Sequence, residues 1–116
     1  MRSGIKIILF AAVALVGVFL VSDYIMTEWH EAAHKQIYKQ AGYDSEIEIY
    51  LSPSGFSGTT TRTAKLRNNT QLGDVIFLAQ AMNESIGYHF FGFLTGMYFL
   101  AFVVFSLFIT YSEAKR

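Results

Sequence analysis

Two long apolar runs, one near each end of the chain, limit its fold more than any other sequence feature. Residues 7–22 carry no charge, and between residues 85 and 112 the only ionisable side chains are His89 and the tyrosines. A helix needs about 20 apolar residues to span the hydrocarbon core of a bilayer. The second run exceeds this length, and the first reaches it if residues 24–26 extend it past Asp23. The sequence therefore predicts two transmembrane helices, at residues 1–26 and 85–111, and a tail at residues 112–116.

The first apolar run has one alternative interpretation, a cleaved signal peptide. Arg2 and Lys6 precede it, but no small-residue cleavage site follows it, so a retained transmembrane helix is favoured. The chain has no net charge, which gives no indication of a nucleic-acid partner. It has no cysteine, which excludes disulfides and thiolate metal ligands.

Two spans place both ends of the chain on the same side of the membrane. Basic residues flank the spans at these ends, which favours both termini in the cytoplasm. The connecting segment, from about residue 24 to 84, also carries basic residues, so the charge asymmetry is small. In the favoured orientation, N-in and C-in, this segment and any site within it lie on the extracytoplasmic side.

The helix of the first span is predicted to continue beyond the membrane. His30, His34, Ile37 and Ala41 recur along one side of a helix, and Gly42 is a natural stop. The pattern is compatible with one uninterrupted helix or with a break between residues 23 and 27.

A β-hairpin and a second helix are predicted to follow. Residues 46–51 alternate between polar and apolar, residues 52–55 hold the only proline, and residues 56–63 are rich in threonine. These patterns predict strand, turn and strand. Residues 68–70 offer helix caps, and a helical pattern runs from Gln71 into the second span. The predicted fold is an α+β membrane protein in which two transmembrane helices flank a small extramembrane region at residues 27–84.

Three glycines in the second span, Gly87, Gly92 and Gly96, include the small-xxx-small spacing that permits close contact between helices. Packing against the small residues of the first span is expected, in preference to dimerisation. Gly87 is also a position at which the helix can bend.

The sequence His30-Glu31-Ala32-Ala33-His34 matches the H-E-x-x-H pattern of zinc hydrolases. Residues four apart lie on one face of a helix, so both imidazoles can reach one metal ion. Glu31 points slightly off that face, where it can act on a metal-bound water molecule instead of ligating. The alternative is an ordinary surface helix, with Glu31 paired to Lys35 and the histidines as polar residues near the membrane.

A catalytic zinc ion needs a third protein ligand and an open position for water. Glu84 and His89, at the mouth of the second span, are the candidates. They are five residues apart on a helix and point in different directions, so only one is expected to bind. A glutamate at the membrane entrance is costly without a partner, which favours Glu84. Tyr88 lies one turn from Glu84 and can hydrogen-bond near the metal, or serve as an aromatic residue of the membrane interface.

With these elements the chain resembles the gluzincin metallopeptidases, in which H-E-x-x-H on one helix is completed by a glutamate on a later helix. The resemblance implies zinc ligation by His30, His34 and Glu84, with Glu31 as the general base. It also implies a transition-state hydrogen bond from Tyr88 or His89, and an edge strand that aligns an extended peptide.

The chain departs from the gluzincin pattern at one position. Many members carry an aspartate four residues after the ligand glutamate, where this chain has Tyr88. The site-2 proteases, the second family considered, also place H-E-x-x-H on a membrane helix. They require a later N-x-x-P-x-x-x-x-D-G motif, which the second span lacks.

These expectations combine into a zinc-dependent, membrane-bound peptidase that hydrolyses peptides or membrane proteins. Tyr24 and Trp29 fit the aromatic belt of a membrane interface, so the metal is expected near the headgroups. The alternative is a non-enzymatic protein with two spans, an adaptor or a structural metal-binding subunit. The sequence leaves open whether an oligomer or a partner subunit completes the site.

Overall fold

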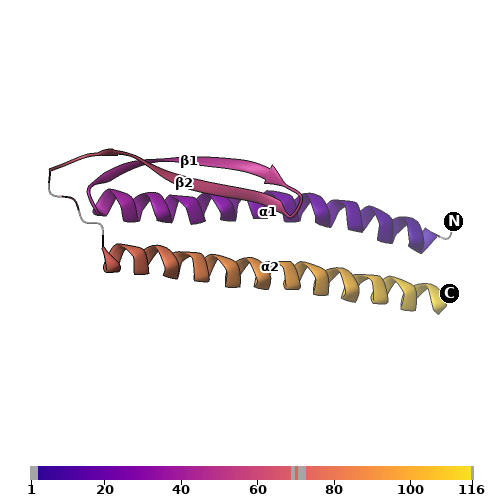
Figure 1. Ribbon diagram of the computed structural model, residues 1–116. Coiled ribbons are helices and arrows are strands. Elements are labelled where there is room, and N and C mark those ends of the chain that lie inside the picture. The colour runs from indigo at the N-terminus through magenta and orange to yellow at the C-terminus, as the bar shows by residue number, and fades with distance from the viewer. Residues whose placement is uncertain (1–2, 69, 71–72, 116) are drawn as a thin grey trace.

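The computed structural model describes residues 3–68, 70 and 73–115 of the chain. It contains two long helices with a hairpin between them in the chain (Figure 1): α1 (Ser3–Gln40), β1 (Tyr43–Ser52), β2 (Gly55–Lys65) and α2 (Asp74–Ala114). The predicted α+β arrangement, with two helices flanking a two-stranded hairpin, is confirmed.

Helix α1 is continuous over 38 residues, so the chain forms one helix and has no break between residues 23 and 27. No glycine or proline occurs between Gly17 and Gly42 that would interrupt it. Gly42 ends the helix as predicted: its φ of 93° is a left-handed conformation that glycine adopts without strain. The chain then reverses direction directly into β1.

The two strands pair antiparallel from Tyr43↔Lys65 to Ser52↔Gly55, with a register shift between Asp44 and Ser45. The predicted turn at residues 52–55 is confirmed. Strand β1 begins at Tyr43, earlier than predicted, because the alternation of buried and exposed residues already starts there.

The hairpin folds back along the C-terminal half of α1 (Figure 1), and Asp23 holds its turn. The Asp23 side chain is fully buried, and its Oδ2 accepts a hydrogen bond of 2.7 Å from the Phe56 backbone N–H. The Tyr24 ring packs edge-on against the Phe56 ring, with centroids 5.2 Å apart. Asp23 is therefore a structural partner of the hairpin.

Helix α2 runs antiparallel to α1, and contacts join them along their length (Figure 1). The Gly4 backbone N–H donates to the Glu113 carboxylate at one end. In the middle, the hydroxyls of Ser22 and Tyr98 lie 2.9 Å apart, and Phe19 packs edge-on against Tyr98. The N-terminal end of α1 and the C-terminal end of α2 consequently lie side by side.

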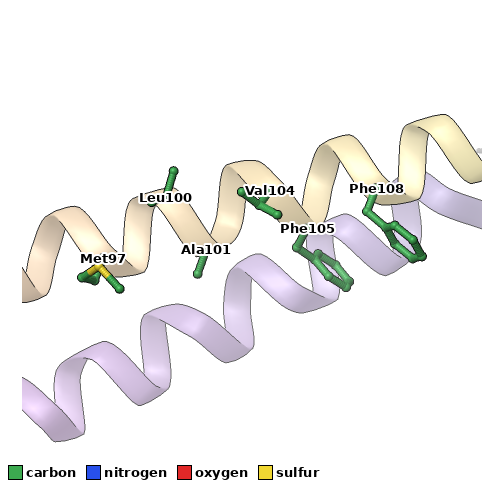
Figure 2. A pocket seen from close by; sticks show the side chains of 6 residues that line it. All are labelled: Met97, Leu100, Ala101, Val104, Phe105 and Phe108. Atoms are coloured by element: carbon green, nitrogen blue, oxygen red, sulfur yellow. The ribbon is translucent and has the colours of Figure 1, made fainter.

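Both helices are long and apolar enough to cross a membrane, judged by length and composition. Only 6% and 0% of the residues in their most apolar windows are buried, so these side chains face outward, unlike those of a buried core helix. The predicted boundaries at residues 26 and 84 fall inside continuous helices, and the orientation in the membrane stays a prediction. Figure 2 shows a groove on α2 whose six lining residues are all apolar: Met97, Leu100, Ala101, Val104, Phe105 and Phe108.

Two local predictions about α2 were wrong. A Cβ placed on Gly92 or Gly96 would meet no atom of the described chain within 4 Å, so these glycines do not pack against the first span. They lie on a side of α2 that does not face α1, although their neighbours Phe91 and Tyr98 contact Phe19. The helix begins at Asp74 with Gly73 as its N-cap, and no side chain caps it, in contrast to the predicted cap at residues 68–70. Of the predicted start, residues 69, 71 and 72 lie outside the described part.

Gly55 is predicted to be required for docking of the hairpin. Its φ of 121° disfavours any side chain, and an added Cβ would lie 2.5 Å from Asp23 Oδ2. Gly55→Ala should lower the free energy of opening the hairpin by about 1–3 kcal/mol. Tryptic cleavage after Arg62 and Lys65 should accelerate in Gly55→Ala and stay unchanged in the neighbouring control Ser54→Ala. Equal cleavage rates in the two variants would contradict this role.

Candidate metal centre

Two histidines of α1 and one glutamate of α2 bring their ligand atoms to one point. His30 Nε2 and His34 Nε2 are 3.2 Å apart, as expected for histidines one turn apart on a helix. Glu84 Oε1 lies 2.8 Å from His34 Nε2 and 3.6 Å from His30 Nε2. The residues come from segments about fifty positions apart, and the antiparallel packing of α1 on α2 joins them.

The geometry of these three atoms fits a zinc ion. Zinc bonds of 2.0–2.1 Å in tetrahedral geometry separate neighbouring ligand atoms by about 3.3 Å. The observed separations of 2.8, 3.2 and 3.6 Å lie around this value. Two imidazoles and a carboxylate are also a common ligand set of catalytic zinc. A hydrogen bond from an imidazole N–H to the Glu84 carboxylate also accounts for the contact of 2.8 Å with His34.

The three side chains differ in their exposure to solvent. The side chains of His34 and His30 are 11% and 21% exposed, whereas that of Glu84 is 46% exposed. A catalytic metal requires one coordination position that water or substrate can reach. Of the three side chains, that of Glu84 has the most contact with solvent.

Further residues of α2 surround the two histidines. The Nδ1 atom of His34 hydrogen-bonds the side-chain carbonyl of Gln80, one turn before Glu84. Asn83 Nδ2 donates a hydrogen bond of 3.2 Å to the backbone carbonyl of His30. Gly87 lies against the His30 ring, where an added Cβ would be 2.6 Å from Cε1 and Nδ1. Because Gly87 has no side chain, the His30 ring can occupy this space.

Glu31 faces the hairpin and is not one of the three converging residues. Successive residues of a helix point about 100° apart, so the neighbour of His30 turns away from α2. The buried Glu31 carboxylate accepts a hydrogen bond of 2.6 Å at Oε2 from the Thr60 hydroxyl, and an added Cβ on Gly58 would collide with it. Within the described residues, Oε1 has no hydrogen-bond partner, and no ion pair joins Glu31 to Lys35.

Tyr88 and His89 are not brought to the three ligand atoms. Tyr88 is 75% exposed, and none of the hydrogen bonds in the described part of the chain involves its hydroxyl. His89 is exposed, and its Nδ1–H donates to the Ser85 carbonyl one turn earlier, at 2.7 Å. Of the two candidates for the third ligand, the structure places Glu84 beside the histidines.

No sequence pattern indicates a role for Gln80, Thr60 or Gly58 in the site. The helical spacing of Gln80 and Glu84 is visible once Glu84 is singled out, since residues four apart share a face. The two hairpin residues carry no pattern that relates them to Glu31.

Comparison of the chain with protein-family models, with curated proteins and with solved structures gives no match.

Gly87 and Gly92 provide a matched pair that tests this geometry. Gly87→Ala should displace the His30 ring and lower bound zinc strongly, because the added methyl group has no space. Gly92→Ala makes the same change in the same helix where no neighbour lies within 4 Å, and should leave zinc binding intact. Metal content of the two purified proteins, after dialysis against equal zinc, measures the difference. Equal zinc content would show that His30 does not occupy this position.

Proposed function

We propose that this protein is a zinc-dependent peptidase that acts on peptides or membrane proteins at the membrane interface. The observation that carries the proposal is the convergence of the ligand atoms of His30, His34 and Glu84. The buried Glu31 directly follows His30 on α1. A resemblance to gluzincins in the order of the elements adds support. Of the chemistries that such a ligand set can perform, hydrolysis makes use of the glutamate beside the first histidine.

In this proposal each of the four residues has a defined task. His30 and His34 would hold zinc through Nε2, and Glu84 through Oε1. Zinc in such a site polarises a substrate carbonyl and makes water more acidic. Glu31 would take the proton of the attacking water on Oε1 and pass it to the leaving amine nitrogen as the C–N bond breaks. Thr60 holds Oε2, and Oε1 has no hydrogen-bond partner within the described residues.

The proposed position at the membrane surface follows from the side chains around the site. Trp29 and Tyr88 are largely exposed, at 72% and 75%, and aromatic residues of this kind favour the headgroup region. The apolar segments of α1 and α2 continue from the site toward the chain ends. Substrates would be extended peptides near the membrane, aligned along an edge of the hairpin.

One observation favours the alternative, a non-enzymatic protein with two spans that holds the metal structurally. Within the described residues, neither Tyr88 nor His89 approaches the ligand atoms, so no second group is in place to stabilise a transition state. The alternative predicts metal binding without turnover, and Glu31 separates the two functions.

Glu31→Gln should keep the metal and abolish hydrolysis, since the residue is not a ligand but supplies the base. Loss of a general base costs about 100-fold to 10,000-fold in rate. New N-termini in membrane fractions, quantified by mass spectrometry, should fall to the level of cells that lack the protein. Glu28→Gln, the same change at an exposed position of α1, should behave as the unmodified protein. Unchanged cleavage in Glu31→Gln with metal retained would refute the peptidase.

The proposed orientation can be tested separately from the chemistry. Reporters fused to either terminus should read cytoplasmic, and one inserted at Ser54 should read extracytoplasmic, because basic residues flank the chain ends. Fusions that place the termini on opposite sides would mean that only one helix spans the membrane.

A further inference from the structure

We infer that Gln80 is a positioning residue of the metal centre, which orients the His34 imidazole so that Nε2 is available to the metal. The inference rests on the proposed zinc site and adds to it a residue outside the ligand set. Its basis is the hydrogen bond between the Gln80 side-chain carbonyl and His34 Nδ1.

The position of Gln80 on α2 suits this task. Gln80 precedes Glu84 by four residues, so both project from one face of α2 on neighbouring turns. The two ring nitrogens of His34 therefore face the same helix, with Gln80 beside Nδ1 and Glu84 beside Nε2. The His34 side chain is only 11% exposed, so water has little access to replace either contact.

The direction of the amide determines which nitrogen of His34 can bind a metal. A neutral imidazole carries its hydrogen on one nitrogen and a free lone pair on the other. When the carbonyl of Gln80 accepts from Nδ1–H, the lone pair is on Nε2, which faces His30 and Glu84. If the amide NH₂ group faced Nδ1 instead, the hydrogen would be on Nε2 and would block ligation.

The other end of the amide supports a role in orientation and not in packing. Gln80 Nε2 is buried and has no hydrogen-bond partner within the described residues. A buried donor without a partner is unfavourable, and an apolar side chain of similar size would remove it. The hydrogen bond to His34 thus explains why a glutamine, and not an apolar residue, occupies position 80. Partners of this kind commonly fix the orientation of metal-binding histidines and increase the basicity of the ligating nitrogen.

Two substitutions distinguish a role of Gln80 as a hydrogen-bond acceptor from a role in filling space. Gln80→Met keeps the length of the side chain and removes the acceptor, whereas Gln80→Glu keeps an acceptor oxygen. Gln80→Leu repeats the first change if the methionine variant does not fold. Gln36→Met makes the same chemical change at an exposed position of α1 and serves as the matched control.

Zinc affinity of the full-length protein in detergent micelles, measured by competition with a chromophoric chelator, is the first readout. Gln80→Met should weaken zinc binding by about 10-fold to 100-fold. Gln80→Glu and Gln36→Met should bind as the unmodified protein does. The second readout is the His34 Nδ1–H resonance of the zinc-loaded protein, which should exchange slowly with water and lose this protection in Gln80→Met. A purely structural role would not separate the glutamate from the methionine variant.

The outcomes separate this inference from the proposed function. If the unmodified protein binds zinc and Gln80→Met binds it equally tightly with Nδ1–H still protected, the role of Gln80 is overturned and the zinc site remains. If the unmodified protein binds no zinc, both proposals fail. If zinc binding weakens equally in Gln80→Met and Gln80→Glu, Gln80 acts through packing and the inference is again overturned.

Discussion

The contact between His34 Nε2 and Glu84 Oε1, 2.8 Å across the interface of α1 and α2, is the interaction on which the rest of the site depends. It exists only in one register of the two helices, since a slip by one turn would move Glu84 by about 5.4 Å. Three other contacts fix the same register: Gly4 with Glu113, Ser22 with Tyr98, and Gly87 against the His30 ring. Packing of the two long apolar helices therefore determines the relative positions of His30, His34 and Glu84.

Helix α1 presents different residues to its two neighbours. His30 faces α2, whereas Glu31, about 100° further around the helix, faces β2. The hairpin can contact Glu31 only while the hairpin stays packed on α1. Asp23 holds the turn of the hairpin against α1 by accepting a hydrogen bond from the Phe56 N–H. Asp23, which directly follows the first apolar run, thus helps to hold the hairpin beside Glu31, the residue proposed as the base.

Local patterns were sufficient to predict the elements of the fold. Gly42 and residues 52–55 marked the ends of α1 and of the strands, and the H-E-x-x-H spacing identified His30 and His34. Glu84 followed from the cost of a charge at the membrane entrance. The hypothesis that it binds zinc stays a prediction, but its position beside the histidines is a feature of the structure.

The residues that support the site could not be predicted, because their roles depend on how distant segments align. Nothing near Gln80 or Thr60 in the sequence indicates which residue of α1 each will meet. Tyr88 shows the limit of spacing arguments: each step of four residues turns by about 40°, so Tyr88 lies about 80° around α2 from Gln80 and becomes exposed. The prediction that the glycines of the second span pack against the first span was wrong for Gly92 and Gly96 for a similar reason. Only Gly87 of the three lies on the side of α2 that meets α1.

Zinc K-edge X-ray absorption on the purified full-length protein, loaded with one equivalent of zinc, tests the central claim most directly. The account predicts a four-coordinate ion with two imidazole nitrogens and oxygen ligands at about 2.0–2.2 Å. A coordination shell made only of oxygen, or zinc that does not stay with the protein, would contradict it.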